Sequence, residues 1–164
     1  MEKRLKQSLG IDVSKLNLSL SLGFLTDKLV KEFTSRSDVS NDISGYKELL
    51  KWLKKSVDDT VELLVVMEAT GVYHQGIAHY LYSHGYAVCV MQSGRVKRYA
   101  QSLDQRSKTD ALDSRMLSML GLERNIRLWH RPSKELQELK GLSRERSSLL
   151  KDRTTETNRQ GAID

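Results

Sequence analysis

The chain has 164 residues, of which 38% are hydrophobic and 29% charged, and its formal net charge is +6. A single cysteine, Cys89, excludes a disulfide framework within the chain and a cysteine-based zinc site. No apolar run approaches the roughly 20 residues that a membrane span needs, and the first ten residues, MEKRLKQSLG, lack the apolar region of a signal peptide. We therefore expect a soluble, cytoplasmic protein of one domain with an appendage.

The positive charge is confined to the second part of the chain. Residues 1–91 contain 11 Lys or Arg against 11 Asp or Glu, whereas residues 92–164 contain 16 against 10. A basic segment joined to a neutral one indicates either a polyanionic partner or a solvated, charge-rich helix surface.

Three strands are predicted at the start of the chain, at residues 5–13, 17–24 and 28–33. Apolar residues alternate with polar ones in the first two, which is typical of half-buried strands. The connections between the three are tight turns, so neighbouring strands must be antiparallel. Residues 34–44 are mostly polar and are predicted to form a loop.

Helices and strands then alternate. The predicted order is helix 45–55, strand 61–67, helix 72–84, strand 86–91, helix 94–103 and helix 110–120. A break between the last two helices is predicted at residues 105–108. Antiparallel strands followed by such units predict an α/β fold, with a mixed five-stranded sheet and helices on its faces. If the first strand pairs with the fourth, the two should run parallel.

After Pro132, the only proline, Ser133 is predicted to cap a long helix that reaches about residue 158. Its leucines are too few to cover one side of a core, and basic residues crowd it. We therefore expect a domain of residues 1–131 followed by a basic helical arm, residues 132–164. The arm is expected to leave the domain and to pair with a second copy of the chain.

Four carboxylates are candidates for a metal site. Asp110 and Asp113 lie three residues apart in a predicted helix, where side chains at this spacing share a face, with Cβ atoms about 5–6 Å apart. Asp12 and Glu68 fall at the carboxyl ends of the first and fourth strands, which run parallel if they are neighbours; this is the edge where sites form in open α/β sheets. Carboxylate oxygens suit Mg²⁺ or Mn²⁺, and two such ions about 3.5–4 Å apart stabilise an in-line phosphoryl displacement.

Ordinary structural roles also explain some of these residues. The helix dipole favours an aspartate in a first turn, and Asp12 suits the turn before Ser14. Glu68 is harder to explain in this way, because half-burying a carboxylate after an apolar run is costly without a partner. Basic residues that flank the carboxylates fit either phosphate contacts or a solvated surface; they are Arg95, Lys97, Arg98, Arg106 and Lys108.

Four motifs resemble those of DEDD transposases, the insertion-sequence recombinases related to the Piv/MooV DNA invertases. They are GIDVS at 10–14, EATGVY at 68–73, QSGRVKRY at 92–99 and KTDALD at 108–113. The resemblance implies an RNase H-like domain of the RuvC type. It implies that a metal-bound catalytic tetrad cleaves and transfers DNA strands, formed by Asp12, Glu68, Asp110 and Asp113. It also implies a structured guide RNA as partner, and a second domain beyond residue 164 that carries a serine used in strand exchange.

Three other functions fit parts of this pattern. A Holliday-junction resolvase or an RNase H-like nuclease would use the same four carboxylates. A catalytically silent nucleic-acid-binding module would need only the basic residues. A sugar-kinase or actin-like ATPase also begins with a GID strand, but it needs a second glycine-rich phosphate loop and an adenosine loop, and the sequence shows neither.

Overall fold

The computed structural model describes residues 3–69, 71–103 and 110–160, without the side chains of 110–112 and 160. Its strands are β1 (Arg4–Val13), β2 (Asn17–Thr26), β3 (Lys31–Ser40), β4 (Leu63–Glu68) and β5 (Ala87–Met91). Its helices are α1 (Ile43–Ser56), α2 (His74–Ser83), α3 (Ser93–Ser102), α4 (Asp110–Glu123) and α5 (Lys134–Gln160). The break predicted at residues 105–108 lies outside the described residues.

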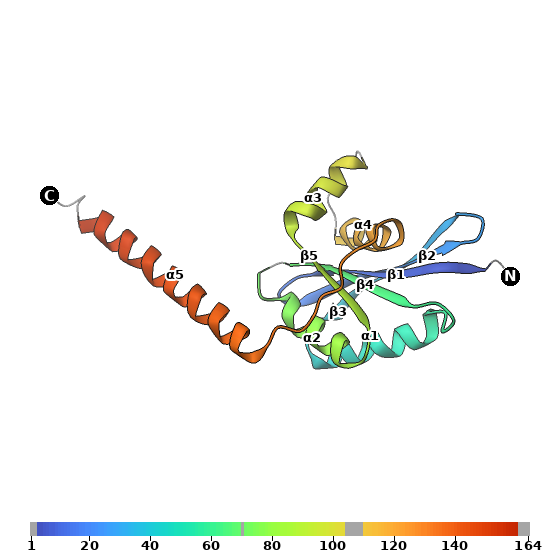
Figure 1. Cartoon of the computed structure of the whole chain (residues 1–164), viewed down its shortest axis with the longest axis horizontal. Helices are drawn as coiled ribbons and strands as arrows, with labels where there is room; N and C mark the ends of the chain where they lie inside the picture. The colour runs from blue at the N-terminus through green and yellow to red at the C-terminus, as the bar shows by residue number, and fades with distance from the viewer. Residues whose placement is uncertain (1–2, 70, 104–109, 161–164) are drawn as a thin grey trace. The chain divides into compact units, whose positions relative to one another are not determined.

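The five strands form one mixed sheet in the order β3-β2-β1-β4-β5 (Figure 1). β1 is antiparallel to β2, and β2 is antiparallel to β3, whereas β1 and β4 are parallel, as are β4 and β5. The predicted fold class, a five-stranded α/β sheet with flanking helices and a long C-terminal helix, is confirmed. The chain divides into two compact units, Met1–His130 and Arg131–Asp164.

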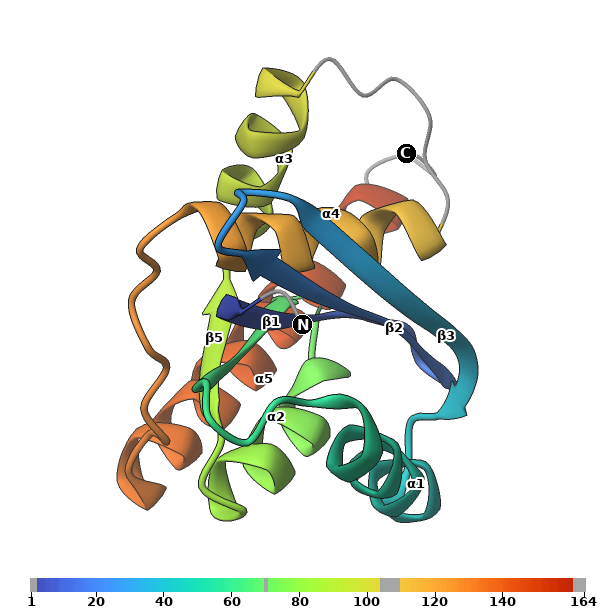
Figure 2. The same ribbon diagram turned by 90° about the vertical axis from the view of Figure 1, so that its right-hand side faces the viewer.

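Helices cover both faces of the sheet in the first unit. α1 and α2 lie on one face, and α3 and α4 lie on the other (Figure 2). Alternate residues of β1 supply the first core: Leu9 and Ile11 pack with Leu49 of α1 and Ile77 of α2. Asp42 begins α1 by accepting a hydrogen bond from the Gly45 N–H at 2.9 Å, which satisfies one of the unpaired donors of a helix start.

A second core fills the other face. Val66 of β4 and Cys89 and Met91 of β5 pack with α3 and α4 through apolar side chains such as Leu117 and Leu120. Each fully buried leucine contributes about 1.5–3 kcal/mol through removal of its surface from water. The sheet is therefore held between two apolar layers.

The third strand was predicted incorrectly. Strand β3 spans Lys31–Ser40, so the predicted strand at 28–33 ends too early and the predicted loop at 34–44 is largely strand. β3 is the edge of the sheet, and Val39 is its only fully buried residue. A mostly exposed edge strand has little apolar alternation, and alternation is the signal on which the sequence prediction depends.

The segment after α4 covers the opposite edge of the sheet. The backbone N–H of Trp129 donates a hydrogen bond to the carbonyl oxygen of Val88 in β5, at 2.7 Å. The indole ring lies edge-on to His79 and Tyr82 of α2, with ring centroids 5.1 and 5.5 Å away. This segment therefore passes from the α4 face of the sheet to the α2 face around β5.

The second unit consists of α5 and the residues beside it. α5 spans 27 residues and forms the long helix that was predicted. The Ser133 hydroxyl accepts a hydrogen bond from the Leu136 N–H at 3.3 Å, as expected for a helix cap. Leu139, Leu142 and Leu149 are 61–63% exposed. None of the helices in the described part of the chain has the length and apolar character of a membrane span.

Candidate active site

Two of the predicted site residues stand at the carboxyl ends of neighbouring parallel strands. Ile11 of β1 pairs with Met67 of β4, so the next residue on each strand is a carboxylate, Asp12 or Glu68. Glu68 in turn pairs with Met91, the last residue of β5. Because adjacent strands lie about 4.8 Å apart, these three strand ends form a row across one edge of the sheet.

Both carboxylates project from the face of the sheet that α4 covers. Side chains alternate between the two faces along a strand, and Ile11 and Met67 belong to the core under α1 and α2. Val66, two residues before Glu68, packs against α4. Asp12 and Glu68 are half-buried, so neither is an ordinary fully solvated surface carboxylate.

Helix α4 packs on β1 at backbone contact distance and runs in the opposite direction. A Cβ atom on Gly121 would lie 2.1 Å from the Ser8 hydroxyl oxygen, and one on Gly10 would lie 2.0 Å from the Ser114 carbonyl oxygen. Moving forward along β1 from Ser8 to Gly10 thus means moving backward along α4. The start of α4 is therefore directed towards the carboxyl end of β1.

This geometry brings the first turns of α4 alongside Asp12. Asp12 lies two residues beyond Gly10, a rise of about 6.6 Å along the strand, which equals about four residues of helix. Four residues before the contact of Gly10 with Ser114 and Leu117, α4 passes through the turn that runs from Asp110 to Asp113. Asp113 is half-buried.

The described side chains do not by themselves form a metal cage. Among them, no group of three or more His, Cys, Asp or Glu is arranged to hold a metal ion. The side chain of Asp110, the fourth predicted ligand, lies outside the described residues. The donor chemistry nevertheless suits Mg²⁺ or Mn²⁺, since all four predicted ligands are carboxylates and these ions prefer oxygen.

A basic helix begins at the same edge of the sheet. α3 starts at Ser93, two residues after the end of β5. It presents Arg95, Lys97 and Arg98, all exposed, whereas its Val96 and Tyr99 are buried. Two other predicted nucleic-acid contacts, Arg106 and Lys108, lie outside the described residues.

Two further arginines were missed by sequence reasoning. Arg124 and Arg127, which follow α4, line a pocket of about 650 Å³ together with Arg95 and Arg98. They were missed because about thirty residues separate them from α3, and no spacing rule connects such distant segments. The excess of basic residues after residue 91 was the only signal in the sequence that included them.

A family of known proteins and two curated relatives match most of the chain. A family described as a transposase, the DEDD type of IS110 elements, matches residues 9–163. The chain is 30% identical over 158 residues to the pilin gene-inverting protein of Moraxella lacunata and 29% identical to that of Moraxella bovis. Each match covers 96% of this chain and 47% of the relative, so the chain spans about half the length of these curated relatives.

Solved structures with a similar chain path include a bacterial RuvC and a viral resolvase. Thermus thermophilus RuvC matches with a TM-score of 0.49 and 12% identity, over 69% of this chain and 90% of that one. A fowlpox virus resolvase, solved with Holliday junction DNA, matches with a TM-score of 0.39 and 13% identity, over 68% and 95%. The family match spans almost the whole chain and confirms the resemblance seen in the motifs, so the chain belongs to the DEDD transposase family.

Proposed function

We propose that this chain is the catalytic part of a DNA recombinase, which cleaves and transfers DNA strands with divalent metal ions. Asp12, Glu68, Asp110 and Asp113 are the proposed ligands of Mg²⁺ or Mn²⁺. The observation that carries the proposal is the adjacency of Asp12 and Glu68 on paired parallel strands, with the first turns of α4 packed alongside. Family membership supports the same reaction class.

Each structural element has a separate role in this proposal. The two strand ends hold Asp12 and Glu68 on a rigid sheet, while α4 supplies the other two carboxylates from one helix face. When bound, the ions would generate a nucleophile from water and stabilise the attacking and leaving oxygens. The exposed cations of α3 would attract the DNA backbone to this edge.

Two partners beyond DNA belong to the proposal. The first is a second copy of the chain, paired through α5. In support of this, Leu142 and Leu149 are seven residues apart, hence on one face of the helix, and both are 63% exposed. The second is a structured guide RNA, for which the supporting feature is the basic character of residues 92–164.

The carboxylate assignment is tested by replacing single ligands without changing their size. Asp12→Asn and Asp113→Asn should each abolish Mn²⁺ binding measured by calorimetry and metal-dependent nicking of supercoiled DNA, while DNA binding is retained. Asp59→Asn is the matched control, because Asp59 is exposed and precedes the amino end of β4, whereas Glu68 lies at the carboxyl end of that strand. If Asp12→Asn nicks DNA as fast as the parent, the carboxylate assignment is wrong. If the parent binds DNA but neither binds Mn²⁺ nor nicks DNA, a catalytically silent binding module explains the chain better.

A further inference from the structure

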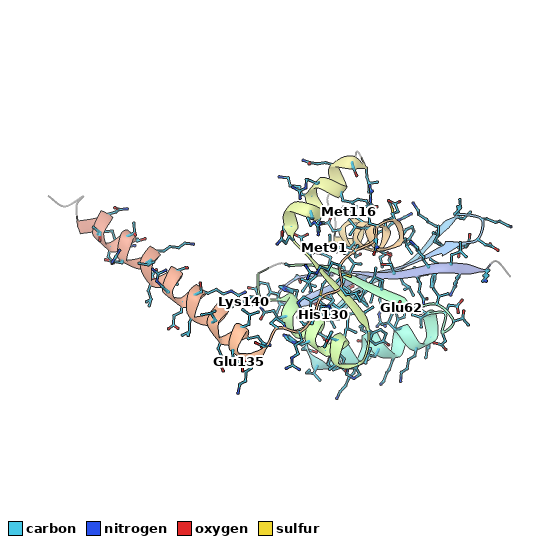
Figure 3. The ribbon with its side chains drawn as sticks, viewed as in Figure 1. Glu62, Met91, Met116, His130, Glu135 and Lys140 are labelled. Carbon is cyan, nitrogen blue, oxygen red and sulfur yellow. The ribbon has the colours of Figure 1, made fainter. Side chains whose placement is uncertain are left out.

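Four arginines from separate parts of the chain line one pocket of the first unit. Arg95 and Arg98 come from α3, Arg124 directly follows α4, and Arg127 lies three residues further on. The pocket has a volume of about 650 Å³ and includes Met91 and Leu120 among its lining residues. Figure 3 shows Met91 at the end of β5, where α3 begins, with Met116 of α4 near it.

The arginines of this pocket form no ion pairs in the described part of the chain. No carboxylate is among the described residues that line the pocket. The nearest acidic residue in sequence, Glu123, interacts electrostatically with Arg124, but its carboxylate is bound by the Lys31 ammonium and by the Tyr99 hydroxyl, which donates to it at 2.7 Å. Four guanidinium groups around one hollow repel one another unless an anion lies between them.

Arginine is the residue best suited to hold a phosphate. Its planar guanidinium group donates two parallel hydrogen bonds to phosphate oxygens and is more weakly hydrated than an ammonium group. Arg95 and Arg98 are three residues apart and so share a face of α3. The apolar side chains of Met91 and Leu120 pack in the second core, so the arginines stand on a rigid base.

The pocket opens one strand away from the candidate active site. Met91, which lines it, is the strand partner of Glu68, and adjacent strands are about 4.8 Å apart. A DNA strand advances about 3.4 Å per nucleotide along the helix axis. A DNA strand with one phosphate at the proposed carboxylate site would therefore place phosphates a few nucleotides away beside the arginines.

We infer that this pocket binds backbone phosphates of the DNA strand a few nucleotides from the cleaved phosphate. The inference rests on the proposed function, since it takes the carboxylate edge as the place of cleavage. It adds Arg124 and Arg127 to the DNA-binding surface, and it gives the end of α4 a role in holding the substrate. The contacts are to phosphates, so the pocket does not select a base sequence.

The test removes two guanidinium groups and compares binding over a range of salt concentrations. Arg124→Gln/Arg127→Gln should weaken binding of a labelled DNA duplex. The plot of log affinity against log salt should become shallower, and the magnitude of its slope should decrease by about 1.8, since each phosphate contact contributes about 0.9 to it. The matched control is Lys47→Gln/Lys51→Gln, which removes the same charge from exposed positions of α1 on the other face of the sheet. Its slope should stay close to that of the parent.

Further variants separate the possible outcomes. Arg124→Lys/Arg127→Lys keeps the charge and should restore most of the slope, which a merely misfolded variant would not do. An unchanged slope in the glutamine variant, or a parent that does not bind DNA, overturns the inference. A loss confined to RNA of the same sequence overturns the assignment to DNA. Mn²⁺ binding by the glutamine variant should equal that of the parent, so failure of the pocket and failure of the carboxylate site give different results.

Discussion

Gly10 of β1 and Ser114 of α4 are in backbone contact: a Cβ atom on Gly10 would lie 2.0 Å from the Ser114 carbonyl oxygen. The nitrogen of Ser118 would be 2.4 Å from the same Cβ atom. Backbone atoms cannot rotate away as a side chain can, so the missing side chain of Gly10 sets the distance between strand and helix. It thereby also sets how close the first turns of α4 come to Asp12.

Gly10→Ala should push α4 away from the sheet. We expect a stability loss of about 1–3 kcal/mol, as is typical of an overpacked core, and weaker Mn²⁺ binding because two proposed ligands move with the helix. Urea denaturation and Mn²⁺ calorimetry measure the two effects. Gly94→Ala in α3 is the control, because a Cβ atom there meets nothing within 4 Å; a Gly10→Ala protein as stable as the parent would show that the contact is not tight.

Metal binding should raise thermal stability. A ligand that binds only the folded protein at 100 times its Kd adds about 2.7 kcal/mol, so the melting temperature should rise with millimolar Mn²⁺ relative to EDTA. Asp113→Asn should remove the shift, because one of the proposed ligands becomes a neutral amide. Equal melting temperatures of the parent in Mn²⁺ and in EDTA would argue against a metal site in this chain.

The stability of the first unit should fall in acid through Glu123. The Lys31 side chain, which donates a hydrogen bond to Glu123, together with the Tyr99 hydroxyl, lowers the pKa of this carboxyl below its ordinary value of 4.5. The stabilisation is thus present above pH 4.5 and is lost as the pH falls through the lowered pKa. Melting temperatures against pH should show a shallower acid decline for Lys31→Gln than for the parent; parallel curves would contradict the coupling.

Alkaline pH should destabilise the first unit through Tyr99, whose hydroxyl donates a hydrogen bond to Glu123. Burial, and then the hydrogen bond to Glu123, raise the pKa of Tyr99 above its ordinary value of 10.0. The stabilisation is therefore complete below pH 10.0 and declines as the pH rises towards the raised pKa. Tyr99→Phe should lose this decline, which melting curves at alkaline pH would detect against the parent.

Pairing of two chains through α5 is tested by sedimentation at several protein concentrations. Leu142→Glu/Leu149→Glu should abolish a concentration-dependent increase in mass, because charges on the shared face cannot be buried without cost. Ser147→Glu/Thr154→Glu, at the same spacing on another face of α5, is the matched control. A parent chain that stays monomeric at high concentration would exclude this mode of pairing.

Sequence reasoning reached the mixed five-stranded sheet for a physical reason. Buried parallel strands are continuous apolar runs, so the strand before Glu68 was visible. Its direction relative to the strand of Asp12 followed from the sequence only on the condition that the two are neighbours, and the structure supplies that pairing. Strand β3 was misplaced because an exposed edge needs no apolar alternation. The arginine pocket depends on the path of the chain after α4, and the sequence holds no local signal for that path.

The hydrogen bond from Trp129 to Val88 also bears on how the first unit is kept from aggregating. An uncovered edge strand is a template for further strands, and edges that are long and apolar promote fibrils. The backbone at Trp129 hydrogen-bonds to the edge strand β5. The opposite edge strand, β3, carries charged side chains and has a register shift in its pairing with β2. A fragment cut before Trp129 would expose β5, and we expect it to precipitate, whereas a fragment that retains residues up to His130 should not.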